Sequence, residues 1–165
     1  MVLGDERAAV TVVEFFDPEC ESCRVFHPMT KMLLQEFEGK IKLQYRYAAF
    51  HRNSEMAIRI LEASRLQNRY WEVLDLLFQH QPEWGSHADP KPELIWNYLV
   101  EAKIDIKAIK DEMFSDSIKS ILEQDRKDVE LLGVRMTPAF FVNGEPLLEF
   151  GYQELRELVL KNLKN

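Results

Sequence analysis

The chain has 165 residues, of which 46% are apolar and 30% are charged, and its formal net charge at pH 7 is −7. This length is enough for one domain with a well-buried core and is short for two. The 21 basic residues are spread along the chain without forming a stripe, which argues against binding to nucleic acid or to anionic lipid. No segment approaches the roughly 20 apolar residues of a membrane-spanning helix, so we expect no membrane insertion by this chain.

The first part of the chain has the pattern of a strand, a helix and a second strand. β-branched and aromatic residues predict a buried strand over residues 9–16, which ends at Asp17-Pro18. Apolar residues then recur at helical spacing over residues 20–37, and Gly39 is typical of a helix C-terminus. Alternation over residues 41–48 predicts the second strand. The two strands should be parallel, with a right-handed crossover.

The rest of the chain divides into a helical stretch and a closing hairpin. No strand pattern occurs between residues 53 and 132, where we expect helices over residues 54–68, 70–81, 92–102, 105–114 and 116–132, with loops around 81–85 and 90–92. Two apolar runs, 139–142 and 146–150, flank Asn143-Gly144, which is the strongest local signal for a β-hairpin. A last helix should cover residues 152–163. The sequence thus predicts an α/β fold with a large helical insert.

The only two cysteines of the chain stand in the segment Cys20-Glu21-Ser22-Cys23, where the first strand passes into the first helix. Two thiols at this spacing can close a small disulfide ring, and the free amides of the first helical turn stabilise a thiolate. The pattern therefore predicts a dithiol redox centre. By position, Cys20 is the attacking thiol and Cys23 the resolving thiol, one turn deeper.

Two other interpretations of the cysteines are weaker. Structural zinc needs four ligands, and only scattered histidines could complete the set, namely His27, His51, His80 and His87. A purely structural disulfide that closes so small a loop would restrict the unfolded chain very little. We therefore expect neither a metal nor a cofactor.

The order of the elements resembles the thioredoxin superfamily, and in particular its DsbA-like branch, which carries a helical domain inserted after the first βαβ unit. The residues that carry this resemblance include the cysteine segment and Thr137-Pro138, which opens the hairpin about 115 residues later. The resemblance covers the chain from about Val10. It implies a thioredoxin fold with a central mixed sheet in a single domain, 1–165, built from a core of residues 9–52 and 133–165 and an insert of residues 53–132.

The resemblance also implies roles for residues outside the cysteine segment. Pro138, which from the sequence alone could be an ordinary turn residue, should follow a cis peptide bond and face the cysteines. Thr137 should then pair with an extended substrate as an added strand. Met136 is a second candidate substrate contact, although it would also suit simple packing. Glu14 could face solvent at a strand edge, but the resemblance places it beneath the active site as a buried acid that relays the proton of Cys23.

The two residues between the cysteines depart from the family pattern. Strongly oxidising relatives have Pro-His there and thioredoxin has Gly-Pro, whereas this chain has Glu21-Ser22, with acidic residues just before Cys20. Negative charge opposes a thiolate, while the helix N-terminus favours it. Activated cysteines of this kind have a pKa between about 3.5 and about 7. We expect that of Cys20 in the upper part of this range, and a less oxidising couple.

These observations predict a thiol:disulfide oxidoreductase that acts on cysteine-containing polypeptides and is reset by a redox partner. The direction of electron flow stays open, so a thioredoxin-like reductase for one specific partner is an alternative. A Cu(I)-binding module using the same cysteines and a peptide-binding chaperone are alternatives from other classes. Residues 1–4 are too short for the apolar part of a signal peptide. The resemblance implies a periplasmic or otherwise extracytoplasmic protein whose export segment is absent from this chain.

Overall fold

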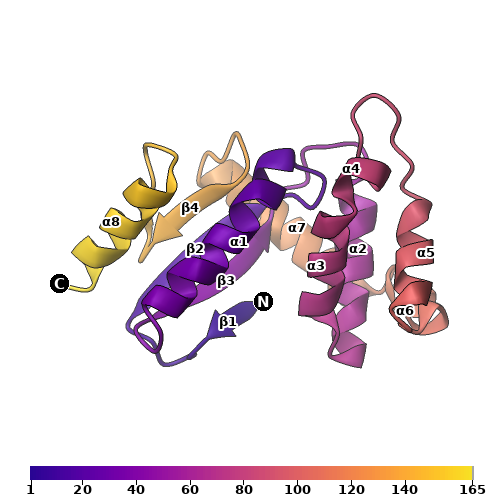
Figure 1. Cartoon of the computed structure of the whole chain (residues 1–165), viewed down its shortest axis with the longest axis horizontal. Coiled ribbons are helices and arrows are strands. Elements are labelled where there is room, and N and C mark those ends of the chain that lie inside the picture. The colour runs from indigo at the N-terminus through magenta and orange to yellow at the C-terminus, as the bar shows by residue number, and fades with distance from the viewer. Residues whose placement is uncertain (165) are drawn as a thin grey trace.

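The computed structural model describes residues 1–164. Within these residues, five strands form one mixed sheet in the order β1-β3-β2-β4-β5 (Figure 1). Strands β2 and β3 run parallel, and the other neighbouring pairs are antiparallel. The strands are β1 Val2–Gly4, β2 Val10–Phe16, β3 Ile41–Tyr47, β4 Ala139–Val142 and β5 Glu145–Pro146. The expected mixed sheet of the thioredoxin fold is thereby confirmed.

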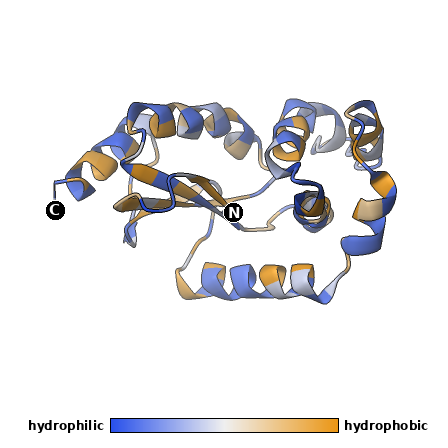
Figure 2. Cartoon of the chain, turned by 90° about the horizontal axis from the view of Figure 1, so that it is seen from below, coloured by the Kyte–Doolittle hydropathy of each residue, from blue (hydrophilic) through white to orange (hydrophobic). Residues whose placement is uncertain are grey.

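The alternation of side chains along β2 gives the sheet two covered faces. On one face, Val12 and Phe16 join a large apolar cluster with Leu33 of helix α1 (Glu21–Glu36) and Leu155 of helix α8 (Tyr152–Asn162). On the other face, Phe15 packs in a smaller cluster with Val129 of helix α7 (Asp116–Leu131). Figure 2 shows helices on both sides of the sheet. Helix α1 therefore carries the cysteine segment onto a fully buried sheet face.

The stretch between β3 and β4 is helical, as expected. It begins with α2 (Ser54–Ala63), and Figure 1 shows α2, α3 and α5 together beside the sheet. Apolar residues of this insert, such as Leu74, belong to the same large cluster as the sheet residues. Insert and sheet therefore bury apolar surface against each other. The other helices of the insert are α3 Tyr70–Gln79, α5 Leu94–Glu101, α6 Ile106–Glu112 and the long α7, which returns to the sheet.

Three short elements differ from the sequence-based expectation. The sequence did not predict β1, which is only three residues long and exists because it pairs with the edge of β3. The predicted helix over residues 54–68 ends earlier, and the 3-10 helix η1 (Ser64–Gln67) follows and stops at Asn68 with a φ of 56°. The expected loop around residues 81–85 contains the short helix α4 (Gln81–Trp84), in which Trp84 is fully buried.

The predicted hairpin is present, but its second strand is shorter than expected. Asn143 and Gly144 both have a positive φ, 47° and 85°, as a tight hairpin turn requires. The second strand covers Glu145–Pro146 and not residues 146–150. Beyond it, Leu148 is 89% exposed, while the ring of Phe150 turns back onto Phe26 with centroids 4.8 Å apart. The apolar run after the turn thus leaves the sheet and does not extend it.

Candidate active site

Cys20 and Cys23 lie at the start of α1, beside the loop that precedes β4. Cys20 is the N-cap residue, with extended backbone dihedrals, and Cys23 lies in the first helical turn. Both are free thiols in this structure. Cys23 is completely buried, whereas Cys20 keeps 8% of its surface exposed. A reactant can therefore reach the sulfur of Cys20 but not that of Cys23.

The two sulfurs have opposite acid–base behaviour. The pKa of Cys20 is lowered to about 5, chiefly because the thiol of Cys23 donates a hydrogen bond to its sulfur. The Thr137 side chain and the amides of Cys23 and Ser22 lower it further, while partial burial acts in the opposite direction. Burial strongly raises the pKa of Cys23, and the nearby charges of Cys20 and Glu14 add to this effect. At neutral pH the reduced pair therefore consists of a Cys20 thiolate and a Cys23 thiol.

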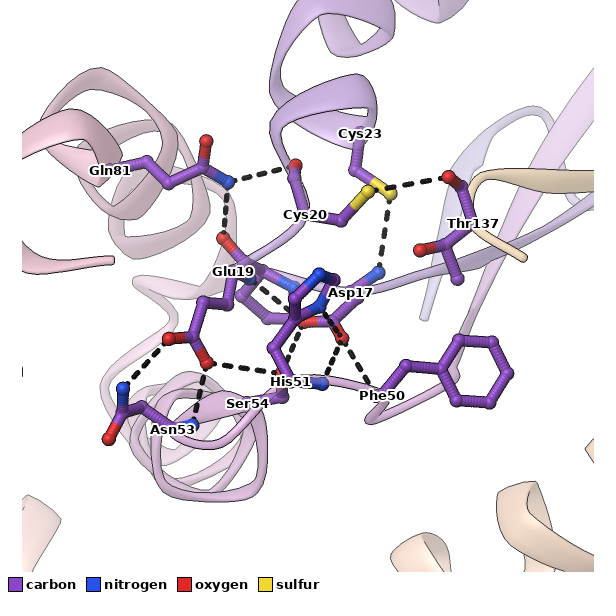
Figure 3. A network of polar contacts seen from close by, with 11 residues as sticks. Asp17, Glu19, Cys20, Cys23, Phe50, His51, Asn53, Ser54, Gln81 and Thr137 are labelled. Carbon is purple, nitrogen blue, oxygen red and sulfur yellow. Dashed lines mark hydrogen bonds and ion pairs between the residues drawn. The ribbon is translucent and has the colours of Figure 1, made fainter. Parts of the chain in front are cut away.

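The loop before β4 completes the surroundings of Cys20. The peptide bond between Thr137 and Pro138 is cis, and Pro138 is buried. The Sγ of Cys20 lies 3.3 Å from the carbonyl oxygen of Thr137, to which the protonated thiol can donate (Figure 3). Met136 stands beside this contact with 71% of its surface exposed. Residues 136–138 thus form one side of the site, with Met136 exposed to solvent and Pro138 buried.

Glu14 lies under helix α1, on the same sheet face as Val12 and Phe16. It is 2% exposed, and its Oε2 has no hydrogen-bond partner among the described residues. Burial raises the pKa of Glu14 to about 8. Because a charge on Glu14 raises the pKa of Cys23, the carboxyl group and the deeper sulfur are electrostatically coupled.

Asp17 is a second buried carboxyl group, in the loop between β2 and α1. Its side chain is fully buried and accepts five hydrogen bonds, from the backbone amides of Glu19, Phe50 and His51, from Nδ1 of His51 and from the hydroxyl of Ser54. Its own backbone N–H points at the Sγ of Cys23, 3.4 Å away. Figure 3 shows how this carboxylate joins the cysteine loop to the start of α2.

Two further side chains hold the cysteine loop against the insert. Glu19 accepts hydrogen bonds from the backbone and side-chain nitrogens of Asn53 at 2.6 and 2.7 Å. Gln81 donates from Nε2 to the carbonyl oxygens of Pro18 and Cys20 at 2.8 and 2.9 Å. The insert therefore supplies hydrogen-bonding partners on two sides of the loop that carries Cys20.

Comparison with known proteins identifies the family of the chain. A family model described as thioredoxin matches residues 1–161. The chain belongs to this thioredoxin family. It is similar to disulfide bond formation protein D of Bacillus subtilis, with 29% identity over 175 residues, which cover 99% of this chain and 77% of that protein. The solved structure of oxidised BdbD from Bacillus subtilis has a TM-score of 0.85 and 28% identity, and the match covers 99% of this chain and 92% of that one.

A relative of another kind matches over a small part of its length. The chain is 30% identical over 146 residues to Na(+)/H(+) antiporter NhaA 3 of Salinispora tropica, which is 87% of this chain but only 21% of that protein. The chain thus spans about a fifth of this relative. The family matches confirm the predicted resemblance to DsbA-like members of the thioredoxin superfamily.

Among the predicted site residues, the structure brings Cys20, Cys23, Thr137 and Glu14 together. It leaves Glu21 and Ser22 exposed at the helix start. The pKa of Cys20, about 5, lies in the middle of the range for activated cysteines and not in the upper part, as expected from the acidic residues. The expectation was wrong because hydrogen-bond donors act directly on the sulfur, while the neighbouring Asp17 and Glu19 have donors of their own.

Sequence reasoning missed Asp17, His51 and Gln81 as site residues. The sequence marks Asp17 only as the end of a strand and a source of negative charge, because its hydrogen-bond donors, apart from the amide of Glu19, come from residues more than 30 positions away. The segment around His51 contributed to the family resemblance, but nothing in its pattern indicated a contact with Asp17. A buried Gln81 has no signature in the sequence at all.

Residues 1–164 contain neither a candidate metal site nor a candidate membrane-spanning helix. No grouping of three or more histidine, cysteine or acidic side chains could hold a metal ion there. None of the helices in this part of the chain has both the length and the apolar character needed to cross a membrane.

Proposed function

We propose that the chain is a thiol:disulfide oxidoreductase that exchanges disulfides with cysteine-containing polypeptides through Cys20 and Cys23. The observation that carries the proposal is the difference between the two sulfurs. Cys20 has a pKa of about 5 at an accessible helix start, and Cys23 is buried with a raised pKa. A structural cysteine pair has no need of this difference, whereas disulfide exchange requires one thiolate that attacks and leaves easily.

The reaction follows from these properties. When the cysteines are oxidised, a substrate thiolate attacks the Sγ of Cys20, the bond between Cys20 and Cys23 breaks, and a mixed disulfide forms. A second substrate thiolate then attacks the substrate sulfur of the mixed disulfide, and Cys20 leaves as a thiolate. The substrate has lost two electrons and gained a disulfide, while the protein holds a Cys20 thiolate and a Cys23 thiol. In the opposite direction, Cys20 attacks a substrate disulfide and Cys23 resolves the intermediate.

Glu14 serves as the proton carrier for Cys23 in this proposal. The buried sulfur must gain a proton when it becomes a thiol and lose it when it resolves a mixed disulfide. A carboxyl group with a pKa of about 8 can exchange a proton near neutral pH, and Glu14 lies on the sheet face beneath the same helix.

Thr137, Pro138 and Met136 form the substrate side of the site. An extended polypeptide that reaches Cys20 passes the backbone of Thr137, whose carbonyl oxygen already lies 3.3 Å from the cysteine sulfur. Backbone hydrogen bonds of this kind bind peptides irrespective of their sequence. The exposed side chain of Met136 adds an adaptable apolar contact.

The setting of the reaction is proposed from relatives. Members named as disulfide bond formation proteins match nearly the whole chain, which supports cysteine-containing proteins as substrates and an extracytoplasmic location. A redox partner must restore the oxidised or reduced pair after each cycle. The alternative of a thioredoxin-like reductase for one partner uses the same residues with the electrons flowing in reverse.

Alkylation with iodoacetamide tests the roles of the two sulfurs. In the reduced protein at pH 7, we expect labelling of Cys20 at least 100-fold faster than labelling of Cys23, because only the thiolate reacts. The Cys23→Ala variant should accumulate a mixed disulfide with a substrate peptide, whereas Cys20→Ala should accumulate none. Equal labelling rates would remove the assigned roles. Tight Cu(I) binding in competition with a chelator, without disulfide exchange, would favour a copper-binding module.

A further inference from the structure

The thiolate of Cys20 has no cation within its own cysteine segment. The two intervening residues are Glu21 and Ser22, and both are exposed. The next residue after the segment, Arg24, directs its Nε to the side-chain oxygen of Gln81 at 3.0 Å. Hydrogen-bond donors already stabilise this thiolate, and a positive charge that adds to their effect has to come from another part of the fold.

His51 is held beside this site by three contacts. It lies in the loop between β3 and α2, and its Nδ1 is 2.8 Å from an Oδ2 of Asp17. Its backbone N–H points at the same oxygen and at the hydroxyl of Ser54, each 3.2 Å away. The ring contacts Asp17 through Nδ1 and the backbone is held by the other two contacts (Figure 3). Because 26% of the side chain remains exposed, the ring can exchange protons with solvent.

The charged groups that face His51 favour its protonated form. Burial opposes a charge on the ring, but Asp17 and Glu19 from the cysteine loop and Cys20 from α1 together raise the pKa of His51 above its ordinary value. The ring of His87, from the loop after α4, is the other titratable neighbour, with centroids 5.4 Å apart. Arg52 follows in the same loop and is exposed.

We propose that protonated His51, held against Asp17, is the cation that stabilises the Cys20 thiolate, so that His51 is a positioning residue whose charge follows the redox state. This inference rests on the proposed function, because it takes Cys20 as the reactive sulfur. If a thiolate on Cys20 favours the proton on His51, that proton must favour the thiolate by the same free energy.

The proton balance of the redox step makes the inference specific. A substrate dithiol that becomes a disulfide gives up two electrons and two protons. The electrons break the bond between Cys20 and Cys23, and Cys23 takes one of the protons. If His51 is already protonated in the oxidised protein, the second proton enters solvent. If His51 is neutral in the oxidised protein, the ring binds the second proton on reduction. Reduction should therefore release less than one proton per molecule at a pH near the pKa of His51.

The first experiment titrates His51 by NMR in the intact chain. We expect a lower pKa of His51 in the oxidised protein than in the protein reduced with dithiothreitol, by about half a unit, as for charges that interact without direct contact in a partly exposed site. The reduced Cys20→Ser variant, which has no thiolate, should match the oxidised protein. An identical pKa in all three forms would overturn the inference. Failure of the reduced protein to exchange with glutathione would instead overturn the proposed function, and the titration is independent of it.

The second experiment uses His51→Gln, which keeps an amide donor near Asp17 but carries no charge. At pH 6 we expect the equilibrium with glutathione to favour the reduced form about threefold less than in the parent protein. The difference between the two proteins should shrink as the pH is raised to 9, because His51 loses its proton. The matched control His87→Gln, which removes the neighbouring ring, should behave like the parent. A deficit of equal size at both pH values would mean that His51 only supports the loop.

Discussion

The loop before α1 and the middle of β2 each bury a carboxyl group beside the cysteine pair, and the two groups have opposite surroundings. Asp17, in the loop, accepts five hydrogen bonds. Glu14, in the strand, has a pKa raised to about 8, and its Oε2 has no hydrogen-bond partner within residues 1–164. Both carboxyl groups are almost completely buried. Equal burial therefore goes with different surroundings, because one carboxyl group has many hydrogen-bond donors around it and the other lacks them.

The difference separates an acid that joins two segments through hydrogen bonds from an acid whose raised pKa suits proton exchange. The donors around Asp17 join the cysteine loop to α2. The surroundings of Glu14 favour the neutral acid, at a cost to folding stability that depends on pH. Substitutions at Asp17, Ser54, Glu14 and Glu21 test this contrast.

The largest effect is expected at Asp17. Asp17→Ala leaves several buried N–H groups without an acceptor and should lower the free energy of unfolding by about 3 kcal/mol or more. Urea denaturation at pH 7 measures this change. As a control, Ser54→Ala removes a single donor to the same carboxylate and should cost about 1 kcal/mol. A loss at Asp17 no larger than that at Ser54 would show that the five contacts do not act as a network.

Glu14 should show the opposite behaviour, with a pH signature. The pKa of Glu14 is about 8 in the folded chain and 4.5 as the ordinary value, so the folded state binds the proton more tightly and stability falls as pH rises between these values. Glu14→Gln should therefore be nearly neutral at pH 4 and stabilising by about 3 kcal/mol at pH 8. Denaturation curves at the two pH values test this. A pH-independent effect would mean that the carboxyl group is hydrated.

The same variant should slow one chemical step. Without an exchangeable proton at position 14, release of a mixed disulfide by Cys23 should be about tenfold slower or more, because general acid–base catalysis is lost. Single-turnover measurements between pH 6 and 8 follow this step. Alkylation of Cys20, which does not need the relay, should be unchanged in Glu14→Gln and provides the control. Normal resolution kinetics would leave Glu14 with no part in the reaction.

The smallest effect is expected at an exposed acid. Glu21 is solvated at the helix start, so its charge acts on Cys20 only through a screened interaction. Glu21→Gln should increase the acid dissociation constant of Cys20 by about twofold at low salt. The change should fade as salt is added. Rates of alkylation between pH 4 and 6 measure it, and a decrease would show that another contact of Glu21 dominates.

The secondary-structure elements that are encoded by neighbouring residues could be predicted from the sequence. The elements that form only through contacts with distant parts of the chain could not. The strand before Asp17, helix α1 and the turn at Asn143 are encoded by neighbouring residues. The three-residue β1 exists only because β3 offers an edge. Helix α4 is too short for any periodicity to appear, and it forms where Trp84 enters the core and donates from its indole nitrogen to Leu77.

The candidate site divides in the same way. The spacing of Cys20 and Cys23 identified the sulfurs, and family resemblance identified Glu14 and Thr137. The pKa of Cys20 could not be predicted from the charges nearby in sequence, because the donors that lower it depend on the folded backbone. The partners of Asp17 lie 33 to 37 positions away in the chain, apart from the amide of Glu19.

The contacts of Gln81 limit how the helical insert can be exchanged between members of the family. Its side chain donates to two backbone carbonyl oxygens of the cysteine loop and also accepts from Arg24, although it belongs to the helical insert, about 60 positions further along the chain. An insert exchanged between family members would therefore have to carry this amide in register, together with the donors at the start of α2. A chimera that keeps both cysteines but lacks these donors would fold around a misplaced thiolate. The helical insert is part of the reactive centre and not an independent module.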